Sequence, residues 1–388
     1  MRGQNLRLLV ESEGTPSVVR KLGRALAEGE LTVQEFSLRE LAEAFLGEAW
    51  VRSLHIAEAG GLELLEAGDA VDVTAYSNIT GQLAYSAILQ GYRMVGFIGE
   101  SLVRTIPTRL SGEKIPGIGK LTDDAESIGD GMPYPNVGNA PEDYIETPST
   151  TKRGLIVPIT KEAIFFDRTG LLIDRCNKVG ERLGLNKEKR ILDVVLGITN
   201  NYKWRGTEYD TYQAATPWIN TAGSVELVDW TDVEAAELLF TDMTDPDTGE
   251  PILIGGRTLL CMPAKLFTAK RILNATEVEH GDVTDGANVP LTRGANPVGD
   301  MGIKLVTSPI AQARLVAASV AAATAKKYWY YGDFPKAFAY MENWPITVVQ
   351  APQNSEAEFT QDIVLRFKAS ERGVCAVWDP RYVLKLTG

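Results

Sequence analysis

A long stretch in the first half of the chain, Arg109 to Thr150, most limits what this sequence can fold into. It is rich in glycine and proline and has almost no apolar periodicity. Residues 113–150 carry eight acidic side chains and two basic ones, which gives this segment a local net charge of −6. Compact domains seldom contain so long a connection unless it has a function or is disordered. We therefore expect an extended hairpin arm that reaches onto a neighbouring molecule.

The composition of the whole chain is that of an ordinary globular protein. Its 388 residues suffice for two or three lobes, and 44% apolar with 23% charged residues excludes general disorder. No apolar run approaches the roughly 18 residues that span a bilayer, and the N-terminus lacks a secretory signal, so we expect cytoplasmic folding and no membrane partner. We expect the three cysteines to be free and buried, because they lie far apart without a C-x-x-C pair: Cys176, Cys261 and Cys375.

Sequence motifs for catalysis, cofactors and metals are absent. The two histidines, His55 and His280, lie outside any catalytic context. Residues 112–120 lack Walker spacing, and the acidic turn 242–250 lacks EF-hand spacing. A net charge of −12 without a visible basic stripe argues against a protein that binds nucleic acid tightly. We therefore predict no catalytic residue, no cofactor and no metal site.

The N-terminal region has the three- and four-residue apolar spacing of amphipathic helices. Between Ser17 and about Leu65 we expect two short helices, the second with a capping box at Ser37 and Glu40. Their apolar residues are Val18, Val19, Leu22, Ala25 and Leu26, followed by Leu38, Leu41, Ala44 and Phe45.

A longer helix is predicted from Thr160, its cap, to Gly184, its stop, with a length of roughly 35 Å. One apolar stripe runs along it, formed by Phe165, Leu172, Cys176, Val179 and Leu183. Asn186 is expected to cap a following helix that ends near Gly197.

The rest of the chain mixes strand and helix patterns, which predicts an α+β fold. Residues 155–157 are typical of a strand, residues 76–102 are mixed, and residues 200–229 are turn-rich and aromatic. We expect helices over 232–243 and 264–275, an acidic turn over 245–256 and a buried strand over 257–262. Residues 277–300 are typical of a loop and residues 311–325 show no clear preference; strands are predicted over 346–350 and 359–368, joined by a loop at 354–358.

The final part of the chain carries the most specific signal. It contains the segments YWYYGDF at 328–334, YMENWP at 340–345, FTQDIVLRF at 359–367 and ERGVCAVWDP at 371–380. This tail resembles the closing segment of the major capsid proteins of tailed bacteriophages, the Hong Kong 97 type of shell protein. The order of helical N-terminus, acidic arm, long helix and tail is similar to that family as well.

The resemblance implies an α+β Hong Kong 97-like capsid fold and gives each region a place in it. Residues 1–75 would form an N-terminal helical arm, 76–108 and 151–224 a peripheral domain with a spine helix over 160–184, 109–150 an extended loop across a neighbouring subunit, 225–326 an axial domain, and 327–388 strands that return to the peripheral domain. The implied function is self-assembly into the hexamers and pentamers of an icosahedral virion capsid, in the cytoplasm of the host bacterium. The implied partners are a portal protein, a scaffold, a decoration protein and packaged double-stranded DNA, contacted non-specifically.

Some relatives weld their shells with an isopeptide bond between a loop lysine and an asparagine of the last strand. The resemblance places Asp362 at the asparagine position, and a carboxylate has no amide leaving group. Lys114 and Lys120 therefore cannot form that bond, and we expect a shell held by non-covalent contacts. The candidate inter-subunit residues are Lys114, Lys120, Asp123, Asp124, Glu126, Asp130, Asp362, Glu371 and Arg372.

Two other interpretations stay open. An encapsulin-type compartment shares this fold but encloses an enzyme cargo instead of DNA. The other is an interpretation of a different class, an enzyme with an unfamiliar carboxylate site built on residues such as Asp123 and Asp124. It is the weakest alternative, because the chain has only two histidines.

Overall fold

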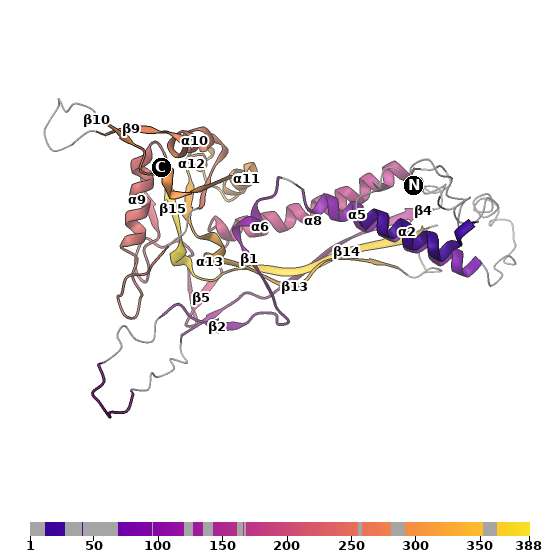
Figure 1. Cartoon of the computed structure of the whole chain (residues 1–388), viewed down its shortest axis with the longest axis horizontal. Coiled ribbons are helices and arrows are strands. Elements are labelled where there is room, and N and C mark those ends of the chain that lie inside the picture. The colour runs from indigo at the N-terminus through magenta and orange to yellow at the C-terminus, as the bar shows by residue number, and fades with distance from the viewer. Residues whose placement is uncertain are drawn as a thin grey trace. The chain divides into compact units, whose positions relative to one another are not determined.

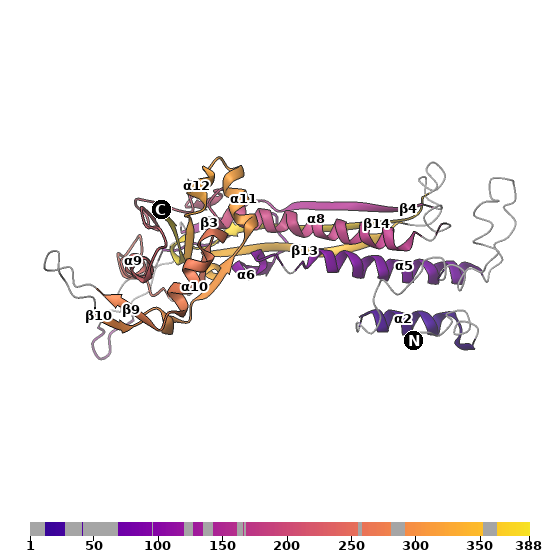
Figure 2. The ribbon, with the colours of Figure 1, turned by 90° about the horizontal axis from the view of Figure 1, so that it is seen from above.

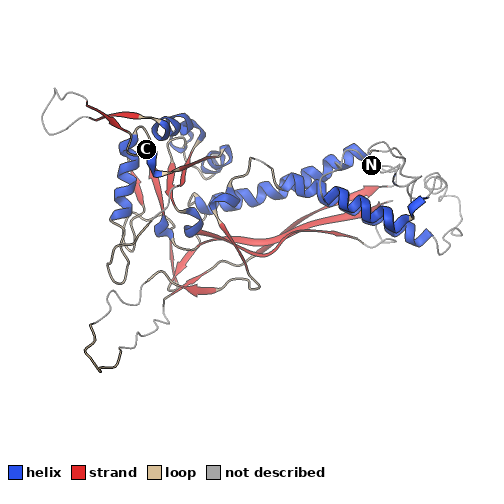
Figure 3. Ribbon diagram, viewed as in Figure 1, coloured by secondary structure: helices blue, strands red, loops and turns tan. Residues whose placement is uncertain are grey.

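The computed structural model combines helices and strands, which confirms the predicted α+β class (Figures 1 and 3). It describes residues 12–27, 41, 69–94, 96–119, 127–134, 143–160, 166, 168–254, 258–280, 292–351 and 363–388. The chain divides into two compact units. The first unit comprises Met1–Val95, Lys152–Asn186 and Trp344–Arg372, and the second comprises Gly96–Thr151, Lys187–Asn343 and Gly373–Gly388.

Among the described residues, helices from three parts of the chain belong to the first unit (Figure 2). They are α2 (Thr15–Ala27), α5 (Asp69–Tyr92) and the N-terminal part of α8 (Thr169–Val195). The predicted helix after Ser17 is confirmed as α2, in which Val18, Leu22 and Ala25 are buried. The second predicted N-terminal helix lies outside the described residues except for Leu41, which is helical and buried.

Two glycines allow α5 and α8 to cross closely. A methyl group on Gly91 of α5 would lie 2.1 Å from the carbonyl oxygen of Asn177. A methyl group on Gly180 of α8 would lie 2.0 Å from the carbonyl oxygen of Ile88. Glycine at both positions therefore lets the two helix backbones touch. This contact explains why most of the mixed region 76–102 forms one continuous helix despite its glycines.

Four strands form a sheet of order β1-β13-β14-β4. They are β1 (Arg104–Pro107), β13 (Phe338–Gln350), β14 (Ile363–Val377) and β4 (Thr151–Thr160). The strands predicted over 155–157, 346–350 and 359–368 are confirmed where the structure describes them, and the loop predicted at 354–358 lies outside those residues. Strands β4, β13 and β14 supply Val157, Ile159, Ile346, Phe367 and Ala369 to the apolar core of the first unit, together with α2, α5 and α8.

Helix α8 has different boundaries from those predicted. The start at Thr160 is wrong, because strand β4 extends to that residue and the helix begins at Thr169. The stop at Gly184 and the cap at Asn186 are also wrong, because both residues lie inside the helix, which continues to Val195. Burial along the continued apolar stripe outweighs the cost of a glycine in a helix interior, about 1 kcal/mol.

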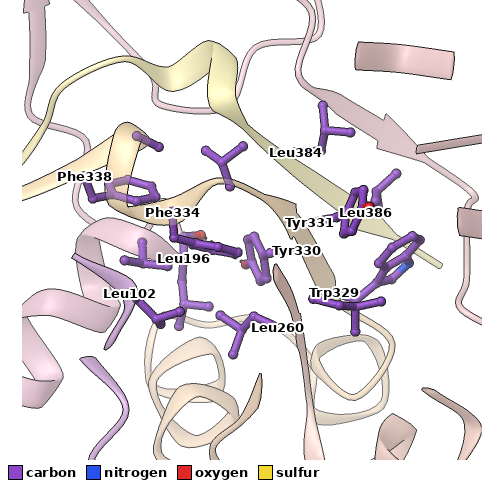
Figure 4. Packing of buried hydrophobic residues seen from close by; sticks show 14 of the residues in the cluster. Leu102, Leu196, Leu260, Trp329, Tyr330, Tyr331, Phe334, Phe338, Leu384 and Leu386 are labelled. Atoms are coloured by element: carbon purple, nitrogen blue, oxygen red, sulfur yellow. Dashed lines mark hydrogen bonds between the residues drawn. The ribbon is translucent and has the colours of Figure 1, made fainter. Parts of the chain in front are cut away.

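A five-stranded sheet of order β11-β8-β12-β15-β7 forms the centre of the second unit. Its elements are β7 (Thr221–Gly223), β8 (Thr258–Cys261), β11 (Lys304–Thr307), β12 (Trp329–Gly332) and β15 (Val383–Thr387), with helices α9 (Trp230–Thr241), α10 (Leu266–Asn274) and α11 (Pro309–Ala317). The helices predicted over 232–243 and 264–275 and the strand over 257–262 are thereby confirmed. Trp329, Tyr330 and Tyr331 of β12 are fully buried and pack with Leu260 and Leu384 (Figure 4).

Regular elements also occur where the sequence predicted loop or gave no preference. Residues 277–300 contain the antiparallel pair β9 (Glu277–His280) and β10 (Thr292–Ala295). Helix α11 is capped by Ser308, whose hydroxyl accepts a hydrogen bond from the Ile310 amide. The remaining short elements are α6 (Gly99–Leu102), η3 (Pro263–Lys265), η4 (Gly299–Met301), α12 (Ala322–Ala325), α13 (Phe334–Ala337) and η5 (Pro380–Tyr382).

All three cysteines are free and buried, as predicted. Burial raises the pKa of Cys176 and Cys261 to about 11 and that of Cys375 to about 12, so their thiols stay protonated at neutral pH. In the part of the chain that the structure describes, no helix is both long and apolar enough to cross a membrane.

Candidate inter-subunit contact site

The acidic segment predicted to form an arm is flanked by two paired strands in the second unit. Strands β2 (Lys114–Pro116) and β3 (Tyr144–Glu146) are antiparallel, with Lys114 opposite Glu146 and Ile115 opposite Ile145. Two further strands, β5 (Tyr202–Trp204) and β6 (Thr207–Tyr209), complete a sheet of order β2-β3-β5-β6. We call residues 113–119 and 143–147 the arm root, because both ends of the arm are fixed there.

Lys114 is engaged within its own arm root. Its ammonium lies 3.3 Å from one Glu146 oxygen and 4.0 Å from the centre of the Tyr144 ring, while Lys203 lies 3.1 Å from the other Glu146 oxygen. The hydrogen bond to Glu146 raises the pKa of Lys114, and the hydrogen bonds from Lys203 and Lys114 lower the pKa of Glu146. Lys114 is therefore a charged, paired lysine and a poor nucleophile.

Asp143 gathers the hydrogen bonds that fix the arm root. Its carboxylate accepts hydrogen bonds from Trp204 Nε1 at 2.6 Å, Arg205 Nε at 3.1 Å and the Gly119 amide at 2.9 Å. Arg205 also reaches Asp247, with 3.0 Å between Nη1 and Oδ1, and its hydrogen bond to Asp247 raises the pKa of Arg205. The turn that carries Asp247 is thus linked to the arm root through Arg205.

A buried arginine connects the arm root to the C-terminal segment. Arg381 donates to the Ile118 carbonyl at 2.8 Å, to Asp379 at 2.9 Å and to Asp245 at 3.3 Å. Burial lowers the pKa of Arg381 while the two carboxylates raise it, and the net direction is upward. Breaking such a buried pair costs about 3–5 kcal/mol, so this cluster fixes the place where the arm leaves the fold.

The acidic turn that contains Asp245 is stabilised by hydrogen bonds within the turn. Asp245 Oδ1 accepts hydrogen bonds from the amides of Asp247 and Thr248 at 3.0 and 3.1 Å, and Oδ2 accepts from Arg381. Within the described residues, no group of three or more His, Cys, Asp or Glu side chains is arranged to hold a metal ion. The oxygen-rich sequence of this turn is therefore used for turn closure and for the buried arginine.

The predicted contact residues fall into three groups. Lys120, Asp123, Asp124, Glu126 and Asp362 lie outside the described residues. Asp130 is exposed and lies in an arm segment, residues 127–134, in which Met132 is 67% and Tyr134 is 83% exposed. This segment combines an acid with two large, mostly exposed apolar side chains.

The tail candidates Glu371 and Arg372 belong to the first unit. Glu371 is buried within its own chain and accepts a 2.5 Å hydrogen bond from the Tyr92 hydroxyl, so its side chain is engaged inside the first unit. The alternation of β14 turns this side chain inward, a register that the sequence motif did not fix. Arg372 lies half-buried over the Trp344 ring, with 5.6 Å to its centre.

Sequence reasoning did not find Asp143, Arg205 or Arg381. Apart from Asp379, which lies two positions before Arg381, their partners lie between 24 and 263 positions away along the chain, so no local spacing connects them. A signal was present at Gly117, where a methyl group would lie 2.1 Å from the Asp143 carboxylate. Glycine is thus needed in the arm for the close approach of that carboxylate.

Comparison with known proteins supports the shell interpretation at the level of the family. A model of the phage capsid protein family matches residues 144–386, more than half of the chain. No curated protein matches in sequence. Similar solved structures include the capsid of an empty GTA particle (TM-score 0.44, 12% identity, covering 76% of this chain and 90% of that one), Mycobacterium phage Cain (0.44, 14%, 75% and 90%) and a virus-like particle from Pyrococcus furiosus (0.42, 10%, 78% and 97%).

These structural likenesses are too low in identity and TM-score to support an argument, so the assignment rests on the family match. That match covers β3, the whole of α8 and nearly all of the β-rich tail. It confirms the kinship with phage shell proteins predicted from the tail: the chain belongs to the phage capsid protein family.

Proposed function

We propose that this chain is a major capsid protein of the Hong Kong 97 type, which self-assembles into an icosahedral shell of hexamers and pentamers around double-stranded DNA. The observation that carries the proposal is the family match over residues 144–386. Membership in a capsid family indicates a structural protein of the virion rather than an enzyme. Assembly in the host cytoplasm and the association with a portal protein, a scaffold and a decoration protein are parts of the same proposal.

The regions keep the roles that the resemblance implies. Residues 1–75 are the N-terminal arm, 76–108 and 151–224 the peripheral domain, 225–326 the axial domain and 327–388 the returning strands. The spine helix takes the boundaries of α8, Thr169–Val195. Residues 109–150 are the extended loop.

We propose that the extended loop binds a neighbouring copy of the chain. The fixed arm root supports this role, because a docking arm gains affinity when its base is held in one orientation before binding. The exposed segment 127–134 offers Met132 and Tyr134 for apolar contact and Asp130 for a charged one. Aromatic residues and methionine are enriched at the buried centre of protein interfaces.

The shell is proposed to lack a covalent weld. A lysine attacks a carbonyl only as the neutral amine, and the pairing of Lys114 with Glu146 raises its pKa and favours the ammonium. Asp362, at the position that the resemblance gives to the reacting asparagine, offers no amide leaving group. Non-covalent arm contacts then have to hold neighbouring subunits together.

Negative-stain electron microscopy of the purified protein tests the proposal, followed by denaturing electrophoresis of the particles. We expect closed icosahedral particles that dissolve to a single band near 42.3 kDa after boiling. A protein that stays monomeric or dimeric in every buffer contradicts the shell function. A ladder of higher bands contradicts only the absence of a covalent weld. Particles that hold a protein cargo and no DNA favour the encapsulin-type compartment.

A further inference from the structure

Helix α8 gathers basic side chains that look scattered in the sequence. Within the first unit, Arg168, Arg175, Lys178 and Arg182 are all exposed. Arg168 directly precedes α8, and its carbonyl accepts a hydrogen bond from the Leu172 amide at 3.1 Å. Spacings of seven, three and four residues then bring the four side chains onto one side of a helix with 3.6 residues per turn. We call these four residues the α8 basic stripe. The expectation that the chain has no basic stripe is therefore wrong for this helix.

The α8 basic stripe is separated from the acids and from the core on the same helix. At about 100° per residue, its four members fall within an arc of about 80°. Asp174 and Glu181 are exposed on the adjacent side of the helix, and Leu172, Cys176 and Leu183 face the core of the first unit. The stripe extends about 21 Å along the helix axis. It is thus a linear basic surface and not an alternation of charges.

The cations of the stripe have no carboxylate partner among the residues that the structure describes. Arg175, Lys178 and Arg182 make no ion pair or hydrogen bond in the described structure, and Arg168 contacts only the Phe166 ring, at 5.5 Å from its centre. Some other cations of the chain are paired, as in Arg314 with Asp193 at 2.6 Å. An unpaired row of cations on a chain with a net charge of −12 leaves a local site for an external polyanion.

We infer that the α8 basic stripe is a surface on which the shell contacts the phosphate backbone of packaged double-stranded DNA, without recognition of bases. The inference rests on the proposed shell function. The cations of the stripe are separated by about 10, 5 and 6 Å along the helix axis, and DNA carries one charge per about 1.7 Å of its axis, so each cation can meet a phosphate. Three of the four residues are arginines, whose planar fork suits phosphate oxygens. The rest of the acidic subunit repels DNA, which keeps the contact local and weak.

A charge-removing variant with a matched control tests this inference. The stripe variant combines Arg175→Gln, Lys178→Gln and Arg182→Gln. The control combines Arg24→Gln, Arg93→Gln and Lys152→Gln, which removes the same charge and the same residue types from exposed positions of the first unit outside α8. Full-length proteins are compared by circular dichroism melting, to establish folding, and by fluorescence anisotropy with a labelled duplex of mixed sequence at salt concentrations from about 50 to about 200 mM.

Three phosphate contacts contribute about −2.7 to the slope of log affinity against log salt, or about 40-fold in affinity over this range. We expect the stripe variant to lose this component while the control keeps the slope of the wild type. Equal slopes for all three proteins overturn the inference. Unchanged DNA binding with a loss of particles in the stripe variant also overturns it, because the stripe is then a contact between subunits. Failure of the wild type to form particles contradicts the shell function itself and is seen separately by microscopy.

Discussion

The two units of the molecule are stabilised by opposite kinds of packing. In the first unit, α5 and α8 touch through Gly91 and Gly180, where no added atom fits. In the second unit, the large side chains of β12 fill the core, and Arg381 is buried among carboxylates. The first unit should therefore be sensitive to added volume, and the second to lost volume and lost charge pairing.

The largest effect is expected from emptying the core of the second unit. Trp329→Ala removes a fully buried side chain and should lower the free energy of unfolding by about 3–5 kcal/mol. Phe267→Ala is the control, because Phe267 is 76% exposed and its loss should change stability by less than about 0.5 kcal/mol. Urea unfolding monitored by fluorescence and circular dichroism measures both. Equal losses would contradict the assignment of β12 to the core.

Added volume should damage the first unit. Gly180→Ala places a methyl group 2.0 Å from the Ile88 carbonyl oxygen and should cost about 1–3 kcal/mol of unfolding free energy. Gly170→Ala, in the same helix with no atom within 4 Å of the added methyl, should leave stability unchanged or slightly raised. Thermal unfolding of both variants measures the difference in stability between them. A Gly180→Ala protein as stable as the wild type would show that the helices do not cross there.

The arm root is expected to depend on Asp143 to a smaller degree. Asp143→Ala leaves the Trp204 and Arg205 donors without their carboxylate and should cost about 1–3 kcal/mol, concentrated at the arm root. Limited proteolysis should show faster cleavage within residues 113–147. Asp130→Ala, which removes an exposed acid of the same arm, should leave the cleavage rate unchanged. The same rate in both variants would mean that Asp143 does not fix the root.

The smallest effect concerns the pH dependence of stability at Glu188 in the second unit. Burial raises the pKa of Glu188, although the hydrogen bonds from the Ile98 and Gly99 amides lower it. A carboxyl group whose folded pKa is raised binds its proton more tightly when folded, so its stabilising effect is complete below the unfolded pKa and is lost as the pH rises through the folded pKa. The unfolding free energy of the wild type, relative to Glu188→Gln, should therefore fall as the pH rises above 4.5. Urea titrations over a pH series measure the difference, and a constant or rising one contradicts the burial effect.

Local signals in the sequence predicted much of the fold. The apolar spacing of Val18, Leu22 and Ala25 found α2, and the alternation in the tail found β13 and β14. The boundaries of α8 and the continuity of α5 could not be predicted, because Gly91, Gly180 and Gly184 are tolerated only by tertiary packing. Propensity rules treat such glycines as helix ends.

The candidate contact site was predictable in part. Charge and glycine content predict an arm over residues 109–150, which stays a prediction, and they could not show that Glu371 turns inward to Tyr92. The sequence also could not predict the arm root, in which hydrogen bonds join Asp143 to Trp204 and Ile118 to Arg381. Contacts between residues so far apart depend on the fold as a whole and leave no local pattern.

The most direct test of the proposed shell function removes the arm and keeps its root. In the variant, a short glycine-serine linker replaces residues 120–142, so the pairing of β2 with β3 is retained. Circular dichroism melting should match that of the wild type, whereas electron microscopy should show no closed particles. Normal particles formed by the armless protein would contradict the claim that this arm holds neighbouring subunits together.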